Sequence, residues 1–246
     1  MSGMTSISRR WFLALATTAI VARRSFGAAE ENIPSVPSDL DHIILGTSDL
    51  DHGISWMEER CGVRAAFGGV HPGRGTRNAL LSLGPRRYLE IMAPDPQQAE
   101  SAGKASPMVK KLLGLKEPKL IAWAVHTNDL ASLAKKAAAA GIDIDPPRDG
   151  SRARPDGKIL RWKSFGLKDD RDGLLPFFIE WSADSVHPSQ DAPAGCLIKA
   201  FSLESGIDGI IQATLRKLGI AAESKAGSKP LLHARFTGKK GEFELA

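Results

Sequence analysis

Cysteine is scarce in this 246-residue sequence, and the usual signatures of covalent and phosphate chemistry are missing. Cys61 and Cys196 are the only cysteines, a number that leaves a single disulfide open without establishing one. No Gly-x-Ser-x-Gly nucleophile elbow and no phosphate-binding loop is present. No catalytic nucleophile therefore stands out, and Cys61 is expected to be a small, buried apolar residue.

A long hydrophobic run is also missing. The apolar stretch from Trp11 to Ala22 is too short to span a membrane as a helix. It overlaps the segment Ser8-Arg9-Arg10-Trp11-Phe12-Leu13, which resembles a twin-arginine motif, and small residues follow at 27–29. We therefore expect residues 1–29 to be a twin-arginine-type signal peptide and the mature chain to be periplasmic or secreted. An ordinary secretory signal or an uncleaved anchor is the alternative.

The surplus of positive charge lies in that segment. The full chain carries a net charge of +5, from 33 Lys and Arg against 28 Asp and Glu. Four arginines and no acidic residue fall within residues 1–29, so the charge of the remainder is near +1. The basic character of the whole chain gives no reason to expect nucleic acid as a partner. The remainder is long enough for one domain with a real core, or for two closely packed modules.

Two stretches of the remaining chain are copies of one another in outline. Each has a β-rich strand, an Asp-Leu pair that begins a helix, a glycine that ends the helix, and a final apolar strand. The first copy ends in YLEIM around Glu90, and the second ends in FFIEW around Glu180. The helix-ending residues Gly62 and Gly141 lie 79 positions apart. Repetition at a fixed period indicates a duplicated module.

A third, partial copy follows at nearly the same period. It has a strand, a helix that ends at Gly219, and a hairpin across residues 238–241. The pattern predicts an α+β fold. The predicted boundaries are 39–182 for the domain, about 39–94 and 119–182 for its two modules, and 196–246 for a partial third βαββ module packed on the same domain.

Both full copies place a carboxylate in the middle of an apolar strand. Burial of a lone carboxylate is costly unless another group pairs with it. If the two sheets curve toward each other, His42, Glu90 and Glu180 converge into a set suited to a divalent ion with open positions. The alternative is that the glutamates pair with arginines such as Arg87 or Arg161.

These strands resemble those of the vicinal oxygen chelate superfamily, and within it the glyoxalase-like domain family. The residues that match are His42 in LDHIIL, Glu90 in YLEIM and Glu180 in FIEW. The resemblance implies paired βαβββ modules in a cupped mixed sheet, with these three residues binding a divalent metal ion. Ala122 stands at the fourth ligand position.

A second motif strengthens the resemblance. Residues 68–84 contain a His-Pro-Gly-x-Gly-Thr-x-Asn pattern that is similar to one typical of the glyoxalase-like family. Glycines let the backbone approach a ligand closely. His71, Thr76 and Asn78 offer an imidazole, a hydroxyl and an amide that suit a small oxygenated substrate; alternatively, they only stabilise the turn. Trp123 is also assigned to substrate binding.

The expected function is that of a glyoxalase-like metalloenzyme acting on a small oxygenated organic compound. The metal would polarise a carbonyl group or stabilise an enolate. Either glutamate, Glu90 or Glu180, would act as general base once off the metal, with Glu180 assigned as catalytic, and His71 would assist proton transfer. Lyase, isomerase, dioxygenase and hydrolase chemistry all stay open. The alternative is a metal-free small-molecule-binding protein of the same fold. The basic residues between 148 and 158 are expected to form a loop, which is either simply solvated or attracts an anionic substrate. A homodimer is a further expectation that the sequence leaves open.

Overall fold

Each of the first two predicted modules folds as one strand, one helix and three further strands. The computed structural model describes residues 35–98, 106–154 and 156–246, and the predicted export signal lies outside them. The first module contains β1 (Leu40–Gly46), α1 (Leu50–Cys61), β2 (Ala66–His71), β3 (Thr76–Ser82) and β4 (Tyr88–Pro94). The second contains β5 (Lys119–His126), α3 (Leu130–Ala139), β6 (Arg148–Ala153), β7 (Ile159–Phe165) and β8 (Phe177–Trp181). The paired βαβββ modules that the family resemblance implies are confirmed.

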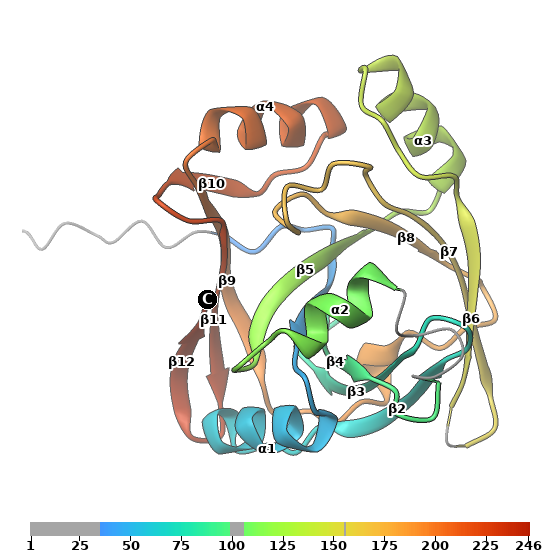
Figure 1. Ribbon diagram of the computed structural model, residues 1–246, viewed down its shortest axis with the longest axis vertical. Coiled ribbons are helices and arrows are strands. Elements are labelled where there is room, and N and C mark those ends of the chain that lie inside the picture. The colour runs from blue at the N-terminus through green and yellow to red at the C-terminus, as the bar shows by residue number, and fades with distance from the viewer. Residues whose placement is uncertain (1–34, 99–105, 155) are drawn as a thin grey trace, which may run out of the picture. The chain divides into compact units, whose positions relative to one another are not determined.

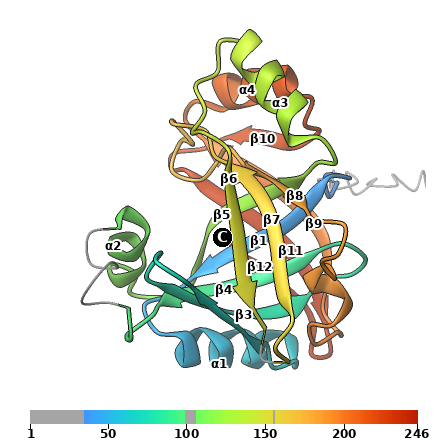
Figure 2. The ribbon, with the colours of Figure 1, turned by 90° about the vertical axis from the view of Figure 1, so that its right-hand side faces the viewer.

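The two modules join into one eight-stranded mixed sheet of order β2-β3-β4-β1-β5-β8-β7-β6. Strand β1 pairs in parallel with β4, and β5 pairs in parallel with β8. The antiparallel pair β1–β5 joins the halves, so both modules have the same strand order when read outward from it. The sheet curls until its two edge strands, β2 and β6, contact each other (Figure 1). Figure 2 views the resulting cup from the side of β6 and β7.

Local sequence explains where the two module helices begin and end. Asp49 caps α1 by accepting a hydrogen bond from the backbone N–H of His52, and Asp129 caps α3 through Ser132 in the same way. Gly62 follows α1 with φ of 73°, a left-handed conformation that favours glycine. The repeated Asp-Leu and glycine signals therefore mark real helix ends.

A separate four-stranded sheet follows the two modules. Its elements are β9 (Leu197–Ser205), α4 (Asp208–Leu218), β10 (Glu223–Ala226), β11 (Leu231–Gly238) and β12 (Gly241–Leu245). The strand order is β10-β9-β11-β12, because β9 pairs in parallel with β10 and antiparallel with β11. The predicted third unit thus repeats the strand–helix–strand succession of the modules but has a different strand order and forms its own sheet.

One hydrophobic core lies between the convex face of the cup and this second sheet. It includes the fully buried Phe178 of the cup and the fully buried Phe201 and Phe236 of the second sheet. Cys61 and Cys196 are free, buried thiols in the same core, as expected for Cys61. Helix α1 contacts β11 and β12, and α3 contacts α4. The packing of the C-terminal unit therefore covers the convex face.

The concave face has a smaller apolar cluster of its own. Ile44, Met92 and Ile121 of the sheet pack there with Leu112 of α2 (Pro107–Leu113). Helix α2 lies over β4 in Figure 1 and contacts it. A short 3-10 helix, η2 (Pro188–Gln190), contacts β3. No helix in the described part of the chain is long and apolar enough to cross a membrane.

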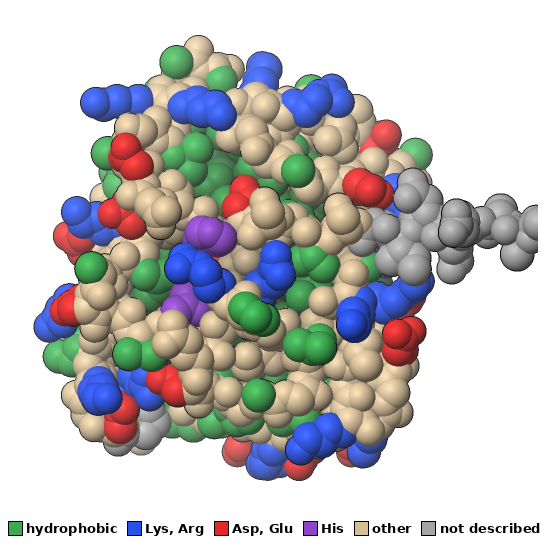
Figure 3. Space-filling model, turned by 180° about the vertical axis from the view of Figure 1, so that it is seen from behind, with side chains coloured by type: hydrophobic (Ala, Val, Ile, Leu, Met, Phe, Trp, Pro, Cys, Tyr) green, Lys and Arg blue, Asp and Glu red, His purple; other side chains and the backbone are tan. Residues whose placement is uncertain are grey.

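The charged side chains on one face of the molecule are mixed in sign. Figure 3 shows this face, where Lys and Arg lie along the upper edge and side chains of both signs are scattered over the rest. A mixed distribution of this kind creates no strong field of one sign. It agrees with the small net charge that remains once residues 1–29 are set aside.

Candidate active site

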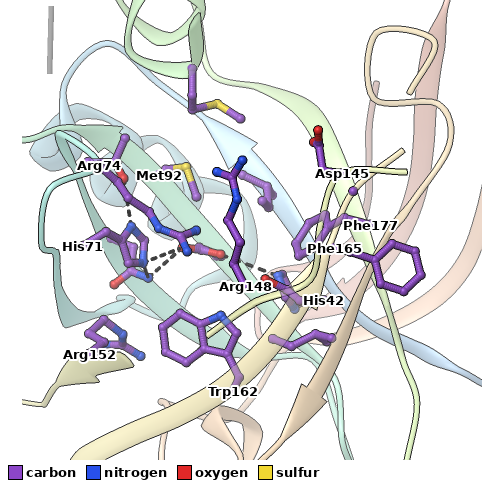
Figure 4. A pocket seen from close by; sticks show the side chains of 18 of the residues that line it. His42, His71, Arg74, Met92, Asp145, Arg148, Arg152, Trp162, Phe165 and Phe177 are labelled. Atoms are coloured by element: carbon purple, nitrogen blue, oxygen red, sulfur yellow. Dashed lines mark hydrogen bonds and ion pairs between the residues drawn. The ribbon is translucent and has the colours of Figure 1, made fainter. Parts of the chain in front are cut away.

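The concave face of the sheet holds a cavity of about 540 Å³. Side chains alternate along a strand, so β1 turns His42 and Ile44 into the cavity, and β4 turns Tyr88 and Glu90 into it. The register aligns these rows, because His42 lies beside Tyr88 and Ile44 lies beside Glu90. Three more polar side chains come from the end of β2 and from β3: His71, which Figure 4 labels, Thr76 and Asn78.

Glu90 is the centre of a buried polar cluster on this wall, and only 5% of its surface is exposed. Its Oε1 accepts a hydrogen bond of 2.7 Å from Asn78 Nδ2. His71 Nε2 lies 3.6 Å from the same oxygen, and His42 Nε2 lies 3.6 Å from Oε2. A carboxylate flanked by two imidazoles can take a proton from a ligand and exchange it with a neighbouring base.

The contacts of His71 define its tautomer. Its Nδ1 lies 2.8 Å from Thr76 Oγ1, and its Nε2 lies 3.3 Å from Asn78 Nδ2. An amide nitrogen only donates, so Nε2 accepts and Nδ1 carries the proton. Burial lowers the pKa of His71, although the Glu90 carboxylate opposes this shift. A neutral imidazole, a hydroxyl and an amide therefore orient one another beside Glu90.

Asp41 positions His42 through a contact with the ring nitrogen that faces away from Glu90. Asp41 is fully buried, and its Oδ1 lies 2.6 Å from His42 Nδ1. Its Oδ2 accepts from Trp181 Nε1 at 3.0 Å and lies 3.2 Å from His187 Nε2. Burial alone would raise the pKa of Asp41, but the hydrogen bonds from His187 and His42 outweigh it and hold the pKa below its ordinary value. An ionised Asp41 fixes the proton on His42 Nδ1 and directs Nε2 toward Glu90.

The second module lines the opposite wall mainly with aromatic and basic side chains. Gly150 in β6 makes room for the Trp162 ring, since a β-carbon at position 150 would lie 2.4 Å from the indole nitrogen. Three arginines line the cavity as well: Arg74 before β3, and Arg148 and Arg152 in β6 (Figure 4). The aromatic residues of this wall are Trp162, Phe165, Phe177 and Trp181.

The sequence of the chain matches the glyoxalase-like domain family over residues 40–207, which is more than half of its length. The chain belongs to this family. The family predicted from the strand and glycine-turn motifs is thereby confirmed. No curated protein sequence matches the chain.

Several solved structures are similar to this glyoxalase-like protein. A hypothetical protein from Staphylococcus aureus is 16% identical, with a TM-score of 0.61 over 78% of this chain and 87% of that one. Methylmalonyl-CoA epimerase from Mycobacterium tuberculosis is 20% identical, with a TM-score of 0.42 over 60% of this chain and 89% of that one. A methylmalonyl-CoA epimerase in complex with methylmalonyl-CoA and NH4+ is 23% identical, with a TM-score of 0.44 over 61% and 99%. At 16% identity, the likeness to the Staphylococcus aureus protein concerns the fold alone.

Five of the residues predicted for the site of this glyoxalase-like protein lie together in the cavity. They occupy the wall built by the first module, and hydrogen bonds or ion pairs connect them around Glu90. These residues lie together because the motifs that predicted them all belong to the first module, whose strands β1 to β4 form one continuous half of the sheet. The five are His42, His71, Thr76, Asn78 and Glu90.

Glu180 lies outside this cluster, which corrects its predicted roles as a metal ligand and general base beside His42 and Glu90. Its Oε2 accepts a hydrogen bond of 2.6 Å from the backbone N–H of Leu130, the first residue of α3. The cavity face of β8 carries Ile179 and its odd-numbered neighbours instead. Relative to the aligned strand β4, the inward row of β8 is offset by one residue, so Glu180 faces the helix.

Trp123 also lies outside the cavity, which corrects its predicted role in substrate binding. It is fully buried in the core between the two sheets, 5.0 Å from the Phe201 ring centroid. Its Nε1 donates to the carbonyl oxygen of Leu174 at 2.9 Å. Its position in β5 points away from the cup, so its contribution is to packing.

Sequence reasoning missed Asp41, Arg152 and His187. Asp41 left a signal, since an acid directly precedes His42 within an otherwise apolar strand. The sequence predicts a basic loop around Arg152, but residues 148–153 form strand β6, and Arg152 is only 4% exposed. His187 follows no motif, and only the folded chain brings it to Asp41.

The donors of this glyoxalase-like site do not fit a divalent ion. The two imidazoles approach different oxygens of Glu90, and Asn78 directs an N–H donor at both His71 and Glu90. Glu180, the ligand expected from the second module, faces α3 instead of the cavity. Within residues 35–98, 106–154 and 156–246, no three His, Cys, Asp or Glu side chains gather in a way that could hold a metal.

Proposed function

We propose that the protein is a glyoxalase-like enzyme that moves a proton on and off carbon in a small, oxygenated organic anion. The observation that carries this proposal is the buried carboxylate of Glu90, with an imidazole nitrogen 3.6 Å from each of its oxygens. Its place in a cavity of about 540 Å³ supports a small-molecule substrate. The family supports an enzyme or a binding protein of this fold.

The roles of the residues follow from their contacts. Glu90 takes a proton from a carbon next to a carbonyl group, and the electron pair moves onto the carbonyl oxygen. His42 and His71 adjoin separate oxygens of Glu90, so each can relay that proton. Asp41 positions His42 for this role. Return of the proton to the other face of that carbon, or to a neighbouring carbon, gives an isomerised product, so the proposal selects isomerase chemistry from the classes that the sequence leaves open.

The charges around the cavity support an anionic substrate. Arg74 and Arg148 line the cavity and are exposed to solvent, so they are placed to attract an anion as it enters. Asp145 and Glu90 are the acidic residues that line the same cavity. Three arginines against two carboxylates leave a positive balance before a substrate binds.

Solvent-exchange spectroscopy tests the proposal. The protein is incubated in D₂O with a panel of 2-oxocarboxylates, 2-hydroxycarboxylates and aldehydes, and loss of the α-proton signal is followed by ¹H NMR. We expect exchange on at least one carboxylate and a loss of at least about 100-fold in Glu90→Gln. Glu117→Gln, which changes an exposed carboxylate, should retain the rate of the parent. Exchange on none of the panel, or full exchange in Glu90→Gln, contradicts the proposal.

A metal-free binding protein is the second candidate. The observation that favours it is the hydrogen bond from Asn78 to Glu90, which already engages one carboxylate oxygen. A ligand that binds only the folded protein raises its melting temperature. A panel member that raises the melting temperature of the parent and of Glu90→Gln equally, without exchange in either, would select this candidate.

Export and assembly remain predictions. The twin-arginine-like motif at residues 8–13 supports a periplasmic or secreted location. Cell fractionation of the full chain and of an Arg9→Lys/Arg10→Lys variant tests it, with retention of the variant in the cytoplasm as the expected result. Light scattering of the mature chain distinguishes the predicted homodimer from a monomer.

A further inference from the structure

Arg152 is a buried cation without a partner. It is only 4% exposed, yet no hydrogen bond or ion pair reaches its side chain from any residue that the structure describes. Its Nη1 is sealed from solvent, while the side chain lines the cavity beside His71 and Trp162 (Figure 4). Burial lowers the pKa of Arg152, and the nearby Glu90 carboxylate opposes the shift. Arginine nonetheless keeps its charge in proteins, so this site holds a positive charge that no described residue pairs with directly.

Asn78 keeps this charge apart from the nearest carboxylate of the cavity. One end of its amide, Nδ2, donates to Glu90. The other end, Oδ1, is buried without a hydrogen-bond partner among the described residues and lies on the side of Arg152. A β-carbon at Gly68 would lie 2.4 Å from Asn78 Oδ1 and 2.8 Å from Arg152 Nη1, so both atoms approach the same point. Asn78 thus prevents Glu90 and Arg152 from neutralising each other directly.

The fold delivers Arg152 to this place across the seam of the cup. Arg152 belongs to β6 of the second module, whereas Asn78 and Glu90 belong to the first. Glycines 68 and 69 allow β2 and β6 to meet, because a β-carbon at Gly69 would lie 2.7 Å from the carbonyl oxygen of Ala153. The two modules therefore contribute opposite charges to one site.

We propose that Arg152 binds the carboxylate or enolate oxygen of the substrate and supplies the positive charge that its reaction needs, in place of a metal ion. This inference rests on the proposed function and narrows its substrate to carboxylates with a carbonyl group next to the carbon that loses a proton. Glu90 takes the proton, the C–H electron pair forms the enolate C=C bond, and the carbonyl π pair becomes the oxyanion beside Arg152. Return of the proton to carbon reverses these shifts, so no oxidant or reductant is required. A guanidinium matches the planar oxygens of such an anion through paired N–H donors.

Oxalate tests this assignment, because it is a planar dianion that resembles an enolate of a 2-oxocarboxylate. Its affinity is measured by calorimetry for the parent, Arg152→Met, Arg152→Lys and Arg161→Met. Arg161, on the neighbouring strand β7, is exposed and pairs with Asp184 at 3.4 Å, so it serves as the matched control. We expect Arg152→Met to weaken oxalate binding at least tenfold, which is the loss of one charge-assisted contact. Arg152→Lys should recover part of the affinity, and Arg161→Met should bind like the parent.

Thermal unfolding separates a binding role from a structural one. A buried cation without a partner does not stabilise the free protein, so Arg152→Met should melt at or above the temperature of the parent. Oxalate should raise the melting temperature of the parent and not that of Arg152→Met. No oxalate binding by the parent, or equal binding by a folded Arg152→Met, overturns the assignment. Glu90→Gln should still bind oxalate, so the result decides the role of Arg152 even if the parent catalyses no exchange.

Discussion

The carboxylate of Glu90 and the guanidinium of Arg152 lie on opposite sides of the Asn78 amide, and no ion pair joins them. A direct pair would stabilise the ionised carboxylate and occupy the arginine at the same time. The separation instead leaves the carboxylate available as a base and the guanidinium available to an anion. The separation of Glu90 and Arg152 depends on the contacts of Asn78 and on the space at Gly68, and mutations can change these one at a time.

Gly68→Ala should disturb this relation without altering a charged residue. The new β-carbon would lie 2.4 Å from Asn78 Oδ1 and 2.8 Å from Arg152 Nη1, so one of the side chains must move. We expect a loss of about tenfold in exchange rate and oxalate affinity, and about 1–3 kcal/mol in the free energy of unfolding. NMR exchange, calorimetry and denaturant unfolding measure the three quantities. Gly209→Ala, in α4 with open space around the new carbon, is the control and should be neutral or slightly stabilising. If the exchange rate, oxalate affinity and stability of Gly68→Ala equal those of the parent, the present positions of the Asn78 amide and the Arg152 guanidinium are not needed for exchange or binding.

Asp41→Asn should lower stability in a way that depends on pH. The variant directs an amide N–H toward buried donors of Trp181 or His187, and we expect a loss of about 3 kcal/mol at neutral pH. The pKa of Asp41 in the folded protein lies below its ordinary value of 3.8, so its contribution is present above about pH 4 and is lost as the pH falls below that. The gap between parent and variant in urea unfolding should therefore narrow in acid. Asp51→Asn, on the exposed side of α1, should stay within about 0.5 kcal/mol of the parent at every pH; a similar loss there would make the effect nonspecific.

Removal of metal ions should leave the protein unchanged. The imidazoles beside Glu90 approach different oxygens, and an N–H donor of Asn78 faces the carboxylate, so we expect no tight divalent site. Elemental analysis should find well below one ion per chain. Dialysis against a chelator, or addition of Mn, Fe, Co, Ni or Zn, should change neither the exchange rate nor the melting temperature. A stoichiometric ion whose loss abolishes exchange would restore the metalloenzyme expected from the sequence.

Glu180→Ala should affect stability and not chemistry. Its side chain accepts from the backbone N–H of Leu130 at the start of α3, and loss of such a cap costs about 1 kcal/mol. Denaturant unfolding measures this loss. Exchange and oxalate affinity should equal those of the parent. A variant that unfolds normally but loses exchange would return Glu180 to the active site.

Much of the fold could be predicted because its signals are local. Asp49 and Gly62 begin and end α1, Asp129 begins α3, and the repeat of these signals revealed the duplication. The residues of strands β2, β6 and β10 could not be located from the sequence, since these strands are short and contain glycines or charged residues. Strands of this kind gain their stability from pairing partners that are distant in sequence.

The candidate site could be predicted only where one module builds it. Glu90 and Glu180 sit in similar strands, and alternation alone does not say which row of a strand faces inward. Packing decides this point: the fully buried Phe178 fills the core on the convex side, and Glu180 shares its row. Arg152 was missed for a related reason, because its burial comes from the meeting of β2 and β6 across the cup.

The antiparallel pairing of β1 with β5 places two halves of one chain around a single cavity. Two identical modules assembled as a homodimer would be bound by symmetry to present the same wall twice. Two modules in one chain can differ in sequence. One half therefore supplies carboxylate and imidazole groups to the cavity, while the other supplies mainly arginine and indole groups. The two halves therefore depend on each other. A mutation in the cavity wall of either half should impair the whole site, and separately expressed halves should form the site only when mixed.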